Sequence, residues 1–223
     1  MENFRIAAEL VTPIIVNTLT LDGLLGAVIF DQLQDIELAH AKIPLRCRDG
    51  LFHASVAQFK ARRQPGRQTL IAGLRASHDL NLDWIQKNPK DPDKPRNQLG
   101  LSRRSQFGNV MNSYATTEAQ EVFWDAQGDP EAVLALLENT HFIGKKRTAG
   151  FGQVKAWYLQ ETDVDGVTDK ALQPMRPVPL DRWDGDPNAL RADAAWRPAY
   201  WMPQHRAICV VPQPGVPDQV AAT

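Results

Sequence analysis

The sequence has 223 residues, of which 43% are hydrophobic and 23% charged, and its formal net charge is −1. This is the balance of an ordinary globular protein with room for one large domain, or one domain and an appendage. No run of about 18 consecutive apolar residues occurs, so we expect no membrane span. The amino-terminal stretch carries Glu2 and Glu9 and does not resemble a secretory signal, so we expect a cytoplasmic protein.

The sequence of the first half of the chain predicts one long helix, with strands before and after it. Alternation in FRIAAELV predicts a first strand, and helical spacing over residues 19–35 predicts a helix that Thr20 or Asp22 could cap. Residues 53–61 alternate and predict a strand. Residues 60–68 predict a basic turn, and residues 69–75 predict another strand.

The second half begins with a long polar stretch that contains several prolines. Residues 76–106 predict an irregular excursion, and a loop of that length is usually functional or mobile. Residues 107–116 then predict a strand, and residues 130–143 a helix that Asp129 caps and Gly144 ends. Residues 153–160 predict the last strand.

These elements follow in the order β-α-β-β-α-β, which is the order of a ferredoxin-like (RRM-like) α+β fold. We expect this core at residues 1–160, with an insertion at about 63–115. Residues 161–212 are rich in proline and acidic residues and predict a small β appendage. Residues 213–223 predict a disordered tail.

The segment GKKRTAGFG, residues 144–152, places three cations among three glycines between the last predicted helix and strand. Residues 44–155 carry a net charge of +6, against −4 before them and −3 after them. Cations after a helix could merely complement its dipole, but that does not explain Gly150 and Gly152. Glycines expose backbone N–H groups to an anion, so the pattern suits a phosphodiester backbone; it lacks the spacing of a nucleotide-binding P-loop.

The side chains that could carry chemistry show no metal-ligand spacing. None of the five histidines forms an HxxxH pair, and Cys47 and Cys209 lie far apart, so we expect two free thiols, no metal and no cofactor. The carboxylate pairs Asp163/Asp165 and Asp184/Asp186 predict exposed, solubilising segments. We expect the tryptophans near the carboxyl end to be core residues rather than an interface.

The glycine-rich loop, its place before the last core strand, and the stretch TPIIVNTLTLDGLLGAVIFD together resemble a known family. The chain resembles the CRISPR-associated RAMP superfamily, and within it the fifth-family Cas subunit of type IV CRISPR effector complexes. The resemblance covers about residues 1–160 as an ordered set of elements, and the polar excursion falls where such subunits carry a thumb-like insertion.

The resemblance implies a non-catalytic subunit that grips the 5′ handle of a CRISPR RNA and caps one end of the backbone filament. Its partners would be the guide, the backbone subunits and the large subunit of an effector directed against foreign DNA such as plasmids, with target DNA a further candidate. The residues expected to contact RNA are Lys145, Lys146, Arg147, Gly150, Phe151 and Gly152, with Arg62, Arg63, Arg67, Arg103 and Arg104 in second rank. Phe107 and Tyr114 are further candidates for base stacking.

Two alternatives stay open at the level of sequence. Some relatives in the superfamily cleave RNA without metal, and a precursor-processing endoribonuclease could use His40 or His53 as general base. The other alternative is an unrelated ferredoxin-like scaffold that binds a small anion and no RNA.

Overall fold

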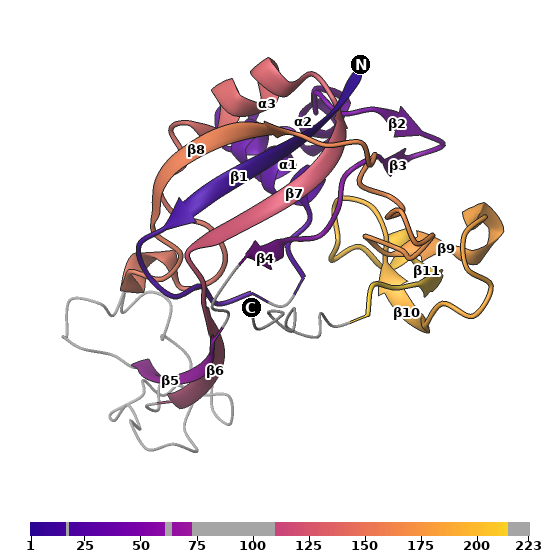
Figure 1. The fold of residues 1–223 in the computed structure, drawn as a ribbon. Coiled ribbons are helices and arrows are strands. Elements are labelled where there is room, and N and C mark those ends of the chain that lie inside the picture. Colours follow the sequence, from indigo (N-terminus) through magenta and orange to yellow (C-terminus); the bar gives the residue numbers. More distant parts are fainter. Residues whose placement is uncertain (17, 61–63, 73–109, 214–223) are drawn as a thin grey trace, which may run out of the picture. The chain divides into compact units, whose positions relative to one another are not determined.

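The computed structural model describes residues 1–16, 18–60, 64–72 and 110–213 (Figure 1). The chain divides into two compact units, one formed by Met1–Pro65 with Thr116–Thr223 and the other by Gly66–Ala115. The architecture mixes helices with antiparallel sheets. Over the described residues, no helix has the length and apolar character needed to cross a lipid bilayer.

The described helices are α1 (Leu21–Leu33), α2 (Ile36–Ala41) and α3 (Pro130–Leu137). The strands are β1 (Glu2–Leu10), β2 (Cys47–Arg48), β3 (Leu51–Phe52), β4 (Gln58–Lys60), β5 (Gln64–Ala72), β6 (Val110–Glu118), β7 (Glu121–Gly128), β8 (Val154–Glu161), β9 (Val178–Pro179), β10 (Arg191–Ala195) and β11 (Arg206–Val210).

The main sheet has the strand order β4-β7-β1-β8, and all its neighbouring strands are antiparallel. Helices α1 and α3 pack against one face of the sheet and lie behind it in Figure 1. The opposite face, called the open face below, is turned toward the viewer. No described helix covers it.

Alternation along the two central strands builds the core. Phe4 and Ile6 of β1 pair with Ala126 and Trp124 of β7, and all four side chains are buried beneath the helices. The indole N–H of Trp124 donates to the carbonyl oxygen of Leu19 at 2.9 Å. This hydrogen bond fixes the chain immediately before α1.

Both long helices begin at the predicted capping residues. The Thr20 hydroxyl accepts a hydrogen bond from the Gly23 N–H at 3.2 Å, so Thr20 rather than Asp22 caps α1. Asp129 caps α3 by accepting from the Ala132 N–H at 3.1 Å. The residues at which both helices begin therefore follow from local sequence signals.

Three of the predicted elements differ from the structure in place or length. The strand predicted at residues 107–116 is present as β6 over its described part, but it pairs with β5 and not with the main sheet. The strand of the main sheet that precedes α3 is β7, which was not predicted. The strand predicted at residues 53–61 is regular only over β4, and β5 begins within the predicted basic turn at Gln64. Helix α3 ends at Leu137, well before Gly144.

The region after β8 contains a second, smaller sheet with the order β10-β11-β9. Its core is formed by Leu51, Val178, Ala189, Trp196, Cys209 and Val210. Arg176 joins this region to the main sheet, since its guanidinium donates to the carbonyl oxygens of Ala54 at 3.1 Å and Trp196 at 2.7 Å. The division of the chain into a core, an insertion, an appendage and a tail stays a prediction.

Candidate nucleic-acid interface

The cationic loop at residues 144–152 lies between Ile143 and β8, and it does not follow directly on a helix. Lys145 lies eight residues beyond Leu137, the last residue of α3. A helix dipole acts over its own last turn, so complementing the dipole of α3 does not explain these cations. Within the loop a short 3₁₀ turn, Arg147–Ala149, is flanked by Lys146 and Gly150 in the left-handed region.

The loop is anchored to the segment between β1 and α1. The Lys145 N–H donates to the Ile15 carbonyl oxygen at 2.8 Å, and the Gly152 N–H donates to that of Pro13 at 2.9 Å. The Thr12 hydroxyl donates to the Gly150 carbonyl oxygen at 2.8 Å and accepts from the Gln153 N–H at 2.9 Å. Thr12 was not among the predicted site residues, because nothing in the sequence links it to a loop 138 residues away.

The glycines of the loop have different structural roles. Gly144 and Gly152 have positive φ angles of 83° and 70° and pack against backbone. A Cβ on Gly144 would lie 2.8 Å from the Ile15 carbonyl oxygen, and one on Gly152 would overlap that of Ile143. Gly150 has φ of 87° but faces open space, with nothing within 4 Å of its Cβ position. Packing therefore accounts for Gly144 and Gly152. The expectation that the glycines present N–H groups to an anion is wrong, because the Gly150 and Gly152 N–H groups donate to the carbonyl oxygens of Arg147 and Pro13 at 2.9 Å. An anion would therefore meet the exposed cationic side chains of the loop.

The three cations of the loop are all exposed. Lys145, Lys146 and Arg147 lie on its outer side, next to exposed Gly150. Within the described part of the chain, no carboxylate pairs with the side chain of Lys145 or Arg147. Their charge is therefore not compensated by those residues and is available to an anion that approaches from solvent.

The structure brings together only some of the predicted RNA-binding residues. Phe151 belongs to the loop and is half-buried. Arg67 is exposed on β5 and Tyr114 is half-buried on β6, both in the unit Gly66–Ala115. Four arginines and one phenylalanine lie outside the described residues: Arg62, Arg63, Arg103, Arg104 and Phe107.

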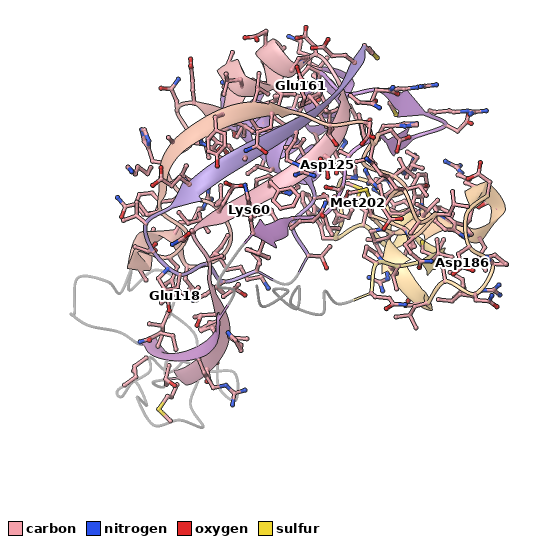
Figure 2. All side chains as sticks on the ribbon, in the orientation of Figure 1. Lys60, Glu118, Asp125, Glu161, Asp186 and Met202 are labelled. Carbon is pink, nitrogen blue, oxygen red and sulfur yellow. The ribbon has the colours of Figure 1, made fainter. Side chains whose placement is uncertain are left out.

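The open face of the main sheet carries charges that compensate one another. Arg5 stacks on the Phe123 ring, 4.1 Å from its centroid, and forms an ion pair with buried Asp125 at 2.7 Å. Figure 2 shows Lys60 at the end of β4, and its amino group lies 3.7 Å from a Glu121 carboxylate oxygen. Burial and a hydrogen bond to Glu121 raise the pKa of Tyr158 to about 12. The charged side chains of this face thus differ from Lys145 and Arg147, which pair with no described carboxylate.

The described histidines do not gather with other groups into a cluster that could bind a metal ion. In the segments that the structure describes, no three His, Cys, Asp or Glu side chains could together hold a metal ion. The His53 Nδ1 lies 2.8 Å from an Asp165 carboxylate oxygen, so Asp165 contacts a specific partner and is not only a solubilising charge. Burial lowers the pKa of His40.

Among the tryptophans near the carboxyl end, Trp196 is a core residue as expected, whereas Trp201 is 74% exposed.

Comparison with known families identifies the class of protein. Residues 68–212, more than half of the chain and including the cationic loop, match the family of CRISPR type IV associated protein Csf3. The chain belongs to this family. It therefore has a role associated with type IV CRISPR systems and acts with other components of those systems. No curated protein matches the sequence.

Proposed function

We propose that the chain is a non-catalytic, RNA-binding subunit of a type IV CRISPR ribonucleoprotein effector complex. It holds the 5′ handle of the guide and caps one end of the filament. Family membership supports the CRISPR context. The observation that carries the RNA part of the proposal is the exposed, anchored loop with Lys145, Lys146 and Arg147 on its outer side.

The arrangement of the main sheet supports a ferredoxin-like core of the RAMP type. The elements β1, α1, β4, β7, α3 and β8 follow in that order, and the strands lie in the order β4-β7-β1-β8. A β-α-β-β-α-β unit with its helices on one face has this arrangement. In such a core the cationic loop lies within the segment that connects the second helix to the last strand.

The chemistry of the loop suits phosphates rather than bases. Lysine and arginine side chains that contact phosphates fix the position of a nucleic acid without reading its sequence. The hydrogen bonds to the segment Thr12–Ile15 hold the loop in one conformation before RNA arrives, which lowers the entropic cost of binding. The half-buried Phe151 ring supplies a surface for one unstacked base.

Several partners follow from this proposal. The loop would bind the guide, while other surfaces would contact the backbone subunits and the large subunit, and target DNA is a further candidate ligand. The complex would act in the cytoplasm, where guide RNA is made and foreign DNA such as plasmids is encountered.

Filter binding with a guide RNA at several salt concentrations tests the proposal. Changing Lys145, Lys146 and Arg147 together to Ala should weaken binding at least 10-fold and reduce the salt dependence by about two to three phosphate contacts. A matched control changes three exposed cations elsewhere, Lys42, Lys170 and Arg191, to Ala. Equal affinities of the two triple variants would contradict the proposal.

A metal-independent endoribonuclease is the second candidate, favoured by the hydrogen bond between His53 and Asp165, which could orient a general base. Incubating the isolated chain with CRISPR RNA precursor in EDTA separates the two functions. The non-catalytic proposal expects no product from the wild type. A product that disappears in His53→Ala would establish the nuclease instead.

A further inference from the structure

A second group of arginines surrounds one tryptophan of the small sheet. The guanidinium carbon of Arg182 lies 4.5 Å from the Trp196 ring centroid, and that of Arg197 lies 5.1 Å from it. Trp196 itself is only 7% exposed, so its ring is a fixed support. Arginine stacked on an aromatic ring keeps its hydrogen-bonding edge free for a planar or tetrahedral anion.

The tip of the β2–β3 hairpin packs against these arginines, and strand β2 ends in another arginine, Arg48. Gly50 has φ of 81°, and its Cβ position lies 3.1 Å from Arg197 Nη1 and 3.5 Å from the Trp196 ring. The absence of a side chain therefore lets the hairpin lie against the stacked arginines. Arg48, two residues before Gly50, has a side chain that is 76% exposed.

The positive charge of this arginine cluster, defined as Arg48, Arg182 and Arg197, is only weakly compensated. The nearest described carboxylates are Asp49, 4.0 Å from Arg48, and Asp181, 4.0 Å from Arg182. Both carboxylates are more than three-quarters exposed, and ion pairs of this kind contribute little. Arg182 donates to the Asp49 carbonyl oxygen, and the buried Nε of Arg197 has no hydrogen-bond partner among the described residues.

An exposed aromatic ring follows the cluster on an anchored turn. The Tyr200 hydroxyl donates to Asp22 at 2.8 Å and accepts from Arg176 at 2.9 Å, which ties the turn to buried groups. The next residue, Trp201, is 74% exposed. Its large apolar ring is thus exposed beside a residue whose side chain is tied to the core, an arrangement suited to stacking on a ligand.

We propose that the arginine cluster binds phosphodiester groups of a single-stranded nucleic acid and that Trp201 stacks on one of its bases. Arginine fits phosphate through paired N–H donors, and aromatic side chains beside cationic grooves bind single strands with little sequence preference. This is a second site, distinct from the cationic loop, and it rests on the proposed function only in sharing a nucleic-acid ligand. The phosphodiester could belong to RNA or to displaced DNA, and the two are distinguished below.

The test is fluorescence anisotropy of the full chain with labelled 12-nucleotide oligo-uridine and oligo-thymidine at several salt concentrations. Arg48→Gln and Trp201→Ala are made at exposed side chains, so they leave the core intact. The matched controls are Arg191→Gln, another exposed arginine, and Ile208→Ala, another exposed apolar residue at 56%.

Arg48→Gln should weaken binding about 3- to 10-fold and lower the salt slope by about 0.7, which corresponds to one phosphate contact on a single strand. Trp201→Ala should weaken binding about 5-fold or more, through loss of stacking. The oligonucleotide that shows the larger losses identifies the source of the phosphodiester, RNA or DNA.

The same measurements in the Lys145, Lys146, Arg147 triple variant separate this proposal from the previous one. If the loop variant loses affinity while Arg48→Gln and Trp201→Ala match their controls, the second site is refuted and the loop proposal stands. If only the cluster variants lose affinity, the loop proposal fails and the second site stands. Absence of any loss at Arg48 and Trp201 with both oligonucleotides would overturn the proposal of a second nucleic-acid site.

Discussion

Arg176 and Asp22 form an ion pair of 3.1 Å in which both side chains are completely buried. Asp22 belongs to the first turn of α1, and Arg176 lies in the region after β8, so the pair joins the main core to the small sheet. Burial opposes the charge of Arg176, but the charge of Asp22 and the hydrogen bonds to Asp22 and Tyr200 together outweigh burial and keep the pKa of Arg176 above its ordinary value. The stretch LDGLL thus has a structural role.

The first prediction concerns this pair. Arg176→Ala should lower the free energy of unfolding by about 3–5 kcal/mol, because it leaves the Asp22 charge buried without its ionic partner and with only the Tyr200 hydroxyl donating to it. Urea denaturation followed by circular dichroism measures the loss. Arg206→Ala serves as control, since Arg206 pairs with Asp193 on the surface and should cost less than about 1 kcal/mol. Similar losses in the two variants would show that the buried pair is not a stabilising link.

The second prediction separates the two kinds of glycine in the cationic loop. Gly152→Ala should lower the free energy of unfolding by more than about 3 kcal/mol, since its Cβ would overlap the Ile143 carbonyl oxygen. Gly150→Ala faces open space and should cost only about 1–2 kcal/mol for its positive φ. Thermal or urea unfolding of both variants checks the difference, and a reversed order would contradict the loop conformation.

The third prediction concerns pH and Asp165. Burial opposes the ionisation of Asp165, but hydrogen bonds from His53 and from the Val167 and Thr168 amides outweigh it and lower its pKa. A lowered pKa adds stability above the unfolded value of about 3.9, and this stability is lost as pH falls through the folded value. Asp165→Asn should therefore lower the free energy of unfolding by about 1 kcal/mol at pH 7. The effect is this small because the Asp165 side chain is partly exposed to solvent.

Urea unfolding at pH 7 and at pH 3 measures this difference. The gap between wild type and Asp165→Asn should narrow as the pH falls below about 4. Asp184→Asn makes the same charge change at an exposed position and should have little effect at either pH. A gap that widens in acid would show that the sign of the shift is wrong.

The fourth prediction concerns the two free thiols. Cys47 is exposed, whereas Cys209 is buried, and burial raises the pKa of the Cys209 thiol to about 11. Because the thiolate is the reactive form, a thiol reagent at pH 8 should modify one cysteine in the native protein and two in urea. Mass spectrometry should find the native label on Cys47. Rapid native labelling of Cys209 would contradict the packing of the small sheet.

Local signals predicted much of the core. Strand β1, helix α1 and strand β8 were confirmed, because period-two alternation, helical spacing and the Thr20 cap are all visible over short windows. Strand β7 was missed because its membership of the sheet depends on partners far away in the chain. One of its polar residues, Asp125, is buried by an ion pair with Arg5, 120 positions earlier.

The end of α3 shows a second limit of local prediction. The apolar residues Phe142 and Ile143 extend the pattern of the helix, yet both make strand-like contacts with Gly152 and Gln153, and Ile143 is buried there. The cationic loop could be found from its own residues, which are contiguous. The arginine cluster could not, because only folding brings Arg182 to the hairpin that carries Arg48, more than 130 positions earlier in the chain.

Photocrosslinking tests the central claim most directly. Guide RNA carrying 4-thiouridine in its 5′ handle is bound to the full chain and irradiated, and the crosslinked peptides are identified by mass spectrometry. We expect crosslinks within residues 144–152. These crosslinks should be lost when Lys145, Lys146 and Arg147 are changed to Ala. Crosslinks that fall elsewhere, with this loop unmodified while RNA is bound, would contradict it.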